Sequence, residues 1–359
     1  MSDGSAARST DVVDPPGGPA APHDLIVKRP KGFASRINGS GRLGGFVRRL
    51  AGLLSTLVAA SFAVFASLYL APGDPVTFLM HGHPATPEAV AAIRQQYHLD
   101  DPFVVRYFDW IGGVLHGDFG RSVQFRQDVS DLLTSRLATT AWLIAYSTLL
   151  IVLVGLVFGA LAALRPGIVD RAVMTVTAIA TATPAFVAAV VLVSVFSVQL
   201  GWLPAFGDGS GAGLGGRISH LTLPAVALAF TFVGLLARVT RASMLAELGR
   251  EHVEVSRSRG VPEASVIRKH VLRNALGPIT TVTGTVVAGL LVSTSIVETA
   301  FGVSGIGQLL VSSVAVKDFP VVQAVCLLVV AAFVIVNLLV DVLLPLIDPR
   351  LARVKVGAA

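Results

Sequence analysis

The segment that decides the fold is Glu251–Pro278, EHVEVSRSRGVPEASVIRKHVLRNALGP, a dense group of charges between two long apolar stretches. Gly260 lies near its centre and suits a left-handed helix terminus, where a side chain would clash. Pro262 then fits the first position of a following helix, and Glu263 is favourable near the N-terminus of that helix. The segment therefore predicts two short helices joined at a fixed corner.

The second of these helices has one apolar stripe, because Ala264, Ile267 and Val271 recur at helical spacing. A solvated basic loop lying on lipid headgroups is the alternative interpretation. Such a loop needs charge, but it needs neither a Gly-Val-Pro corner nor a stripe. These two features favour docking into the groove of a partner protein.

The composition indicates an integral membrane protein. Of the 359 residues, 53% are hydrophobic and 14% are charged, whereas soluble domains carry roughly a quarter charged residues. The net charge of +6 comes from short groups of Lys and Arg beside apolar runs, which fits an anionic cytoplasmic leaflet rather than nucleic acid. Cys326 is the only cysteine, so an intramolecular disulfide and a Cys-based metal site are excluded.

Six uncharged runs reach the roughly 20 residues that a helix needs to cross the hydrocarbon core of a bilayer. They are Leu50–Gly73, Leu137–Leu164, Ala172–Gly207, Ile218–Ala237, Asn274–Val297 and Phe319–Val340. A seventh run, Thr299–Val316, is rich in glycine, and we expect a short external or re-entrant segment there. Pro184 is expected to bend the third span.

Basic residues fix the expected orientation. Arg42, Arg48 and Arg49 precede the first span and predict a cytoplasmic N-terminus. With six spans, every cluster of basic residues beside a span then lies on the cytoplasmic side. The Glu251–Pro278 segment is one of these clusters. Seven spans would place the basic C-terminus outside.

The segment also carries a resemblance. Glu254, Gly260 and the following HVLRNALGP resemble the EAA loop of ABC-importer permease subunits, with Glu254, Val255 and Ser256 standing where that family has Glu-Ala-Ala. Four other stretches resemble the first, B-type permease subunit of the dipeptide, oligopeptide and nickel branch: LAPGDPV (70–76), HLDDPFVVRYFDWIGGVLHGDFGRS (98–122), ETAFGVSGIGQLLVSSVAVKDFPVVQA (298–324) and LIDPRLAR (346–353). The resemblance covers residues 45–353.

The resemblance implies an all-α integral membrane protein with six transmembrane helices of the type I ABC importer permease fold. The chain is then expected to divide into a cytoplasmic tail (1–45) that its polar composition leaves disordered, a first transmembrane helix (46–73), an extracytoplasmic loop domain (74–136), a permease core (137–345) with a coupling loop (241–275), and a cytoplasmic tail (346–359). Within the loop domain, Thr86 is expected to cap a helix that has Pro87 at its first position and Glu88 in its first turn.

The resemblance further implies that the loop couples the spans to an ATPase. The coupling residues would be Glu251, Glu254, Val255, Ser256, Arg257, Gly260, Val261, Pro262, Arg268, Asn274 and Pro278. The implied partners are a second homologous permease, two cytoplasmic ATPases that bind ATP and Mg²⁺, an extracytoplasmic binding protein and membrane lipid. The chain itself would hold no cofactor, bind no nucleic acid, and lie in the prokaryotic plasma membrane with both termini in the cytoplasm.

Two other functional classes are weighed against the permease subunit. A secondary carrier usually keeps ionisable groups at mid-membrane, but here the spans hold few, with Glu298 near a span end and Asn337 as a lone polar residue. These two are candidates to line the path or a gate, although for Glu298 a hydrogen bond to the Gly-rich segment behind it is favoured. An enzyme would need a catalytic motif, and the sequence has no HExxH, GxSxG or Walker A pattern.

The substrate is the least constrained part of the interpretation. Short peptides are the main expectation, with nickel, glutathione or haem as alternatives. Four histidines of the external loop could form a metal site, although ordinary loop histidines are favoured: His81, His83, His98 and His116. Gly155, Gly159, Gly284 and Gly289 are expected to permit close helix packing rather than to contact substrate.

Overall fold

A computed structural model describes residues 40–70, 86–96 and 100–347. The chain divides into two units, residues 1–50 and 51–359, and the first is described only where helix α1 (Ser40–Leu70) begins. The predicted C-terminal tail lies almost wholly outside the described residues, as does the N-terminal tail up to residue 39. His81, His83 and His98 also lie outside them.

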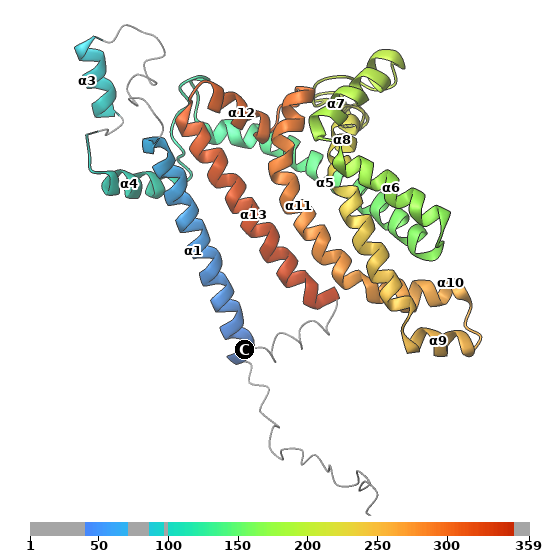
Figure 1. Cartoon of the computed structure of the whole chain (residues 1–359). Helices are drawn as coiled ribbons and strands as arrows, with labels where there is room; N and C mark the ends of the chain where they lie inside the picture. Colours follow the sequence, from blue (N-terminus) through green and yellow to red (C-terminus); the bar gives the residue numbers. More distant parts are fainter. Residues whose placement is uncertain (1–39, 71–85, 97–99, 348–359) are drawn as a thin grey trace, which may run out of the picture. The chain divides into compact units, whose positions relative to one another are not determined.

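Regular structure in the described residues is helical, with one isolated bridge between Arg121 and Asp128. The predicted all-α class is therefore confirmed. Within the part of the chain that the structure describes, four helices are long and apolar enough to cross a membrane, and helices of this group lie beside one another in Figure 1. They are α5 (Val129–Leu164), α8 (Gly213–Leu248), the continuous α10 (Glu263–Val266), η2 (Ile267–Leu272) and α11 (Arg273–Phe301), and α13 (Phe319–Ile347).

The predicted third span is broken rather than continuous. α6 (Ile168–Ala182) is followed by α7 (Ala185–Leu192) and the π-helix η1 (Val193–Gln199), with a bend of 100° between the two parts. Pro184 sits at the break with φ −58° and ψ 140°, which is not a helical conformation, and its ring provides no amide to continue the helix. The position of the bend was predicted. Counted as one broken span, the pair brings the number of candidate spans in the described residues to five.

The other segments of the second unit are shorter helices. α1 carries an apolar stretch, Ala51–Ser67, where the first span was expected. α3 (Pro87–Gln96) begins at Pro87 with Glu88 in its first turn, as predicted. α4 (Phe103–Leu115) packs on α1, and α9 (Glu251–Ser258) follows α8. The Gly-rich run Thr299–Val316 is largely helical. α11 ends within it, at the left-handed Gly302, and α12 (Ile306–Ala315) follows.

Glycines bring the long helices into close contact, as predicted. A Cβ atom on Gly155 would lie 2.9 Å from Leu236 of α8, and one on Gly159 would overlap Thr240 of the same helix. Gly284 of α11 faces Val340 of α13 in the same way. The α5 backbone at Gly155 and Gly159 thus lies directly against Leu236, Ala237 and Thr240 of α8. A shift of one helix past the other would require the interface to repack.

Candidate functional site

The segment between α8 and α11 forms the predicted corner. α8 ends at Leu248, the chain turns through Gly249 and the extended Arg250, and α9 begins at Glu251. Gly260 has φ +73°, the left-handed conformation that glycine adopts without strain. Pro262 is the cap before α10 rather than its first helical residue, and its carbonyl accepts bonds from the amides of Ser265 and Val266.

An ion pair closes the corner. The Arg257 guanidinium donates from Nε to Glu263 Oε2 at 3.1 Å and from Nη2 to Glu263 Oε1 at 2.6 Å. The two side chains are 42% and 53% exposed, so solvent screens much of their attraction. These hydrogen bonds raise the pKa of Arg257 above its ordinary value. The pair joins the end of α9 to the start of α10 across the turn at Gly260.

The inner face of the corner is buried in the core of the chain itself. Val253, Val266 and Val271 are fully buried and belong to the main hydrophobic cluster. Of the predicted stripe, Val271 is buried and Ile267 is half-buried against the same cluster, whereas Ala264 is exposed and Val266 is buried instead. The π-helix η2 (Ile267–Leu272) explains the change, because it widens the spacing of residues on one face to five.

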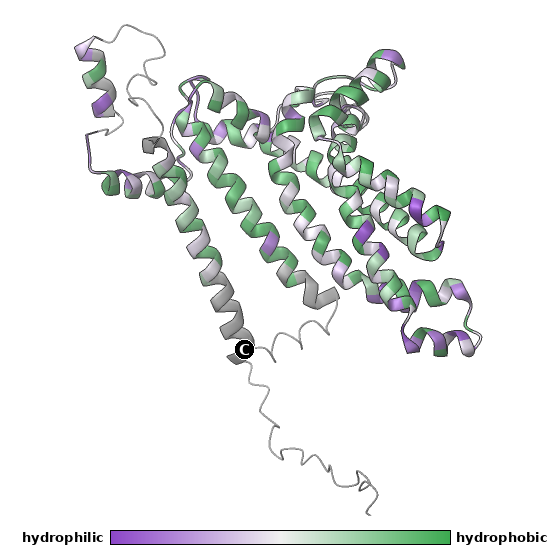
Figure 2. Ribbon diagram, viewed as in Figure 1, coloured by the Kyte–Doolittle hydropathy of each residue, from purple (hydrophilic) through white to green (hydrophobic). Residues whose placement is uncertain are grey.

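The outer face of α9 is charged and exposed. Glu251, Glu254 and Arg257 are exposed, and Val255 is 46% exposed among them. Figure 2 shows the hydrophilic colouring gathered on α9 and α10, in contrast to the long helices. An exposed apolar side chain within a charged face suits docking to another protein.

The corner is also tied to the end of α8. Glu247 is largely buried and pairs with Arg250 at 3.1 Å. Asn274, in the first turn of α11, donates to the His270 carbonyl at 2.7 Å and lies 3.4 Å from His252 of α9. Among the other predicted coupling residues, Ser256 donates to the His252 carbonyl, Val261 is half-buried, Arg268 is exposed, and Pro278 lies inside α11. The structure thus places most of the predicted residues at one corner and Pro278 in the adjoining span.

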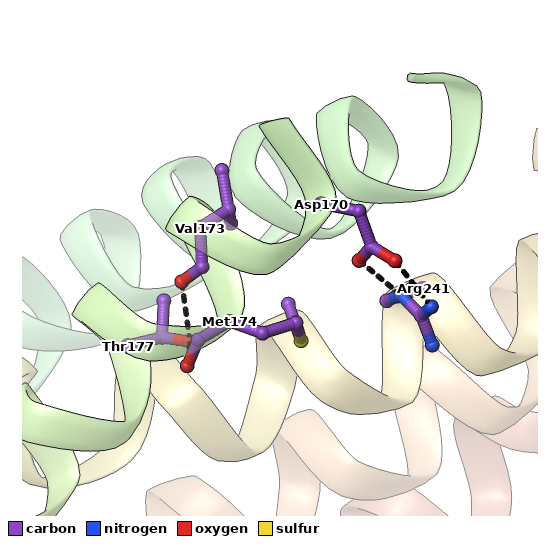
Figure 3. A network of polar contacts seen from close by, with 5 residues as sticks. All are labelled: Asp170, Val173, Met174, Thr177 and Arg241. Atoms are coloured by element: carbon purple, nitrogen blue, oxygen red, sulfur yellow. Dashed lines mark hydrogen bonds and ion pairs between the residues drawn. The ribbon is translucent and has the colours of Figure 1, made fainter. Parts of the chain in front are cut away.

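A second ion pair connects α8 with α6. Arg241 donates from Nε and Nη2 to the two carboxylate oxygens of Asp170, both at 2.6 Å (Figure 3). Thr177, farther along α6, donates back to the carbonyls of Val173 and Met174. Gly234 of α8 meets Thr177 and Thr181 of α6 so closely that a Cβ atom would not fit. α5, α6 and α8 therefore form one closely packed group, with α9 attached to its end.

An open groove of about 480 Å³ lies between α5, α11 and α13. Eight of its ten lining residues are aliphatic and the other two are Thr140 and Thr148. The lining residues are Leu137, Thr140, Ala141, Ile144, Ala145, Thr148, Val287, Leu291, Ala332 and Val336. The groove thus offers a neutral surface and no ionisable side chain.

The two candidate path residues differ in their surroundings. Glu298 is fully buried and accepts hydrogen bonds from Thr140 Oγ1 at 2.7 Å and from the Gln308 amide at 3.0 Å. Thr140 Oγ1 in turn accepts from the Ile306 amide at 2.8 Å. Glu298 thereby holds the first turn of α12 against α5 and α11. Asn337 is half-buried and donates to the Phe333 carbonyl of its own helix. Neither of them lines the groove.

Sequence reasoning missed a second buried carboxyl group at this end of the spans. Asp318 is fully buried and accepts hydrogen bonds from Ser122 Oγ and, at 3.1 Å, from the Gln124 amide. It therefore links the start of α13 to the loop before α5. Asp208, in the loop before α8, accepts from Thr139 Oγ1 at 3.2 Å. Burial raises the pKa of Asp208, but hydrogen bonds from Ser210 and Thr139 outweigh this and leave the pKa lowered. For Asp318, the available signal in the sequence was an isolated acidic residue directly before the long apolar run that begins at Phe319.

No group of three or more His, Cys, Asp or Glu side chains that could hold a metal ion occurs within the described ranges. The only candidate histidine of the external loop that falls in these ranges, His116, has its Nδ1 2.8 Å from the Gly112 carbonyl.

Comparison with known proteins identifies close relatives. Residues 155–353 match the family described as binding-protein-dependent transport system inner membrane component, and residues 43–144 match the N-terminal family of such membrane components. The chain is 39% identical to the glutathione transport system permease protein GsiC of Salmonella choleraesuis (strain SC-B67), over 85% of this chain and 97% of that protein. It is 38% identical to the probable peptide ABC transporter permease protein y4tP of Sinorhizobium fredii, over 85% of this chain and 98% of that protein.

A solved structure supports the fold. The chain is similar to a chain of the MetNI methionine ABC transporter in an inward-facing conformation, with a TM-score of 0.51 and 21% identity. The similarity covers 60% of this chain and 96% of that chain. The predicted class, a helical ABC-importer permease, is therefore confirmed.

Proposed function

The chain belongs to the family of binding-protein-dependent transport system inner membrane components, and we propose that it forms half of the path through which an ATP-driven importer moves short peptides. Members of this family are membrane permease subunits rather than enzymes, and they act in systems that depend on a binding protein. The energy for uptake is supplied by ATPase subunits on the cytoplasmic side. In the orientation expected from the basic residues, both termini lie in the cytoplasm, and the membrane that the protein crosses is the bacterial plasma membrane.

The observation that carries the proposal is the two-sided corner of α9 and α10. Its inner side, with Val253 and Val266, is buried in the permease core, while its outer side presents Glu251, Glu254 and Val255. A segment fixed to the spans on one side and open to a partner on the other can transmit motion between them. The outer side of α9 is the surface that we assign to the ATPase.

The packing of α8 supports transmission of that motion. α9 follows α8 after two residues, and α8 is joined to α5 through Gly155 and Gly159 and to α6 through Asp170 and Arg241. A displacement of α9 would therefore carry α5, α6 and α8 together. When ATP closes the two ATPases against each other, this group would tilt and open the path outward.

The groove between α5, α11 and α13 supports a role in the path. It is open, and its lining side chains are neutral. A surface of this kind suits substrates of varied sequence, because it offers no charged group that would select among them. A second homologous permease would complete the enclosure, and the segment 71–136 is the proposed landing surface for the binding protein.

Glutathione is a second candidate substrate. One relative is named as a glutathione permease and another as a probable peptide permease, with nearly equal identity to this chain. Glutathione is itself a tripeptide, so both names describe the same class of chemistry.

Stimulated ATP hydrolysis tests the proposal. The chain would be co-expressed with the permease, ATPase and binding-protein genes of its own locus and reconstituted in lipid nanodiscs. We expect the ATPases to co-purify, and we expect dipeptides to tetrapeptides or glutathione to raise hydrolysis only when the binding protein is present. Failure of every peptide and of glutathione to raise hydrolysis by a complex that binds ATP would contradict the proposed substrate class.

A further inference from the structure

Helix α4 (Phe103–Leu115) has two apolar stripes, and only one of them is packed. Phe103, Tyr107 and Trp110 recur at helical spacing and face α1. Their rings lie 5.4–5.7 Å from those of Phe62 and Phe65, with Phe103 and Tyr107 contacting both and Trp110 contacting Phe65. The Tyr107 hydroxyl lies 2.8 Å from Ser61 Oγ. This stripe fixes α4 to α1.

The second stripe is exposed. Val104, Phe108 and Leu115 follow at i, i+4 and i+11, and they are 58%, 64% and 80% exposed. Ile111 lies on the same stripe and is half-buried. About 100° per residue places this stripe roughly a quarter-turn from the one that packs on α1. Three large apolar side chains in a row on one helix face are costly in water.

The remaining face of α4 carries its two charged side chains. Arg106 and Asp109 lie there with Val105 and two glycines, and His116 lies just beyond the helix. α4 is therefore an amphipathic helix whose apolar arc is wider than its contact with α1. Figure 1 shows α4 running across α1 rather than along it. If α1 crosses the bilayer, α4 lies close to the membrane plane.

The position along α1 at which α4 makes contact matches the depth of the membrane interface. α1 has 31 residues and is about 46 Å long at 1.5 Å per residue, which exceeds the ~30 Å hydrocarbon core. Ser61 and Phe65 lie nine and five residues before its last residue, Leu70, or about 8–14 Å from the end of the helix. Amphipathic helices at an interface bury their apolar face about 5–10 Å into the boundary between headgroups and acyl chains.

α1 also has an exposed apolar face, which reaches the packed stripe of α4 at Phe62. Leu54, Val58 and Phe62 recur every fourth residue and are 54%, 61% and 48% exposed, and Phe62 contacts Phe103 and Tyr107. Exposed aliphatic and aromatic side chains on such a helix suit contact with lipid. We propose that α4 lies in the interface of the leaflet at the C-terminal end of α1, with Val104, Phe108 and Leu115 in contact with lipid.

Site-directed spin labelling tests this inference in the full complex. In a Cys326→Ala background, a label is introduced by Phe108→Cys, and the matched control is Asp109→Cys, one residue away on the polar face. The complex is reconstituted in vesicles of phosphatidylethanolamine and phosphatidylglycerol. The ratio of oxygen to water-soluble nickel-chelate accessibility is expected to be about tenfold higher at position 108, since one face lies in lipid and the other in water.

Two outcomes would overturn the inference. Equal ratios at the two positions would mean that both faces lie in water. Low accessibility to oxygen and to nickel chelate at position 108 would mean that protein covers the stripe. The measurement requires neither substrate nor ATP, so its result is independent of the proposed transport function.

Discussion

The continuous helix Glu263–Phe301 ends in two different kinds of joint. Near its C-terminal end, Glu298 is fully buried, and its partners Thr140 and Gln308 come from two other helices. At its N-terminal end, Glu263 is about half exposed and pairs with Arg257, six residues away. A buried, hydrogen-bonded carboxyl group holds its neighbours in one arrangement, whereas an exposed pair exchanges partners at little cost. The first joint suits a fixed frame and the second a docking point for another protein.

Removing the buried carboxyl group is expected to have the largest effect on stability. Glu298→Ala leaves Thr140 Oγ1 and the Gln308 amide without their acceptor, and such losses cost about 2–4 kcal/mol together. The melting temperature of the purified complex should fall by several degrees. Asp109→Ala, on the exposed polar face of α4, is the control and should leave the melting temperature unchanged. Equal melting temperatures for both variants would remove the distinction between the two joints.

A smaller and more local effect is expected from Asp318→Asn. With its oxygen in the place of Oδ2, the new amide can still accept from Ser122 and the Gln124 amide, but its NH2 group then faces the Val123 amide, which donates to Oδ1 at 3.4 Å. The loss of the charge and of this acceptor is worth about 1–3 kcal/mol. Hydrogen exchange should accelerate at the amides of residues 123–125. Asp109→Asn, on the exposed face of α4, is the matched control. Unchanged exchange in the Asp318 variant would show that the loop is held by other contacts.

The sequence allowed local features to be predicted, but not contacts between distant segments. Gly260 and Pro184 were identifiable because backbone conformation depends on the residue itself and its neighbours. The partners of Glu298 and Asp318 were not, because Thr140 and Ser122 are more than 150 residues away in the chain. The apolar stripe was assigned with α-helical spacing, and nothing in Ile267–Leu272 distinguishes a π-helix from an α-helix before the tertiary contacts are known.

The exposed joint is tested by Gly260→Val. A β-branched residue at φ +73° is strained by about 1–2 kcal/mol, which should distort the corner without affecting the spans. We expect peptide uptake to fall while ATP hydrolysis continues. Gly249→Val is the control, because Gly249 has φ −83° and its Cβ atom would meet only the Leu245 carbonyl, at 3.9 Å. Normal uptake in the Gly260 variant would contradict the role of the corner in coupling.

The smallest change in stability is expected from exchanging the charges of the exposed pair. Arg257→Glu should weaken retention of the ATPase with little effect on melting, since the side chain is exposed. Adding Glu263→Arg restores an ion pair of reversed sign. Recovery of ATPase retention in the double variant would mean that Arg257 acts through the shape of the corner. Continued loss would mean that Arg257 contacts the ATPase directly, and full retention in the single variant would exclude both roles.

The π-helical turn at Ile267–Leu272 bears on how this segment tolerates changes in length. A π-turn contains one residue more than an α-helical turn, and such turns can arise from a single-residue insertion into a regular helix. Deleting one residue here would leave an α-helical turn, and the residues before it would keep their faces relative to α11, because the wide turn holds the additional residue. The direction in which the charged face of α9 points is therefore expected to survive the loss of one residue from this turn.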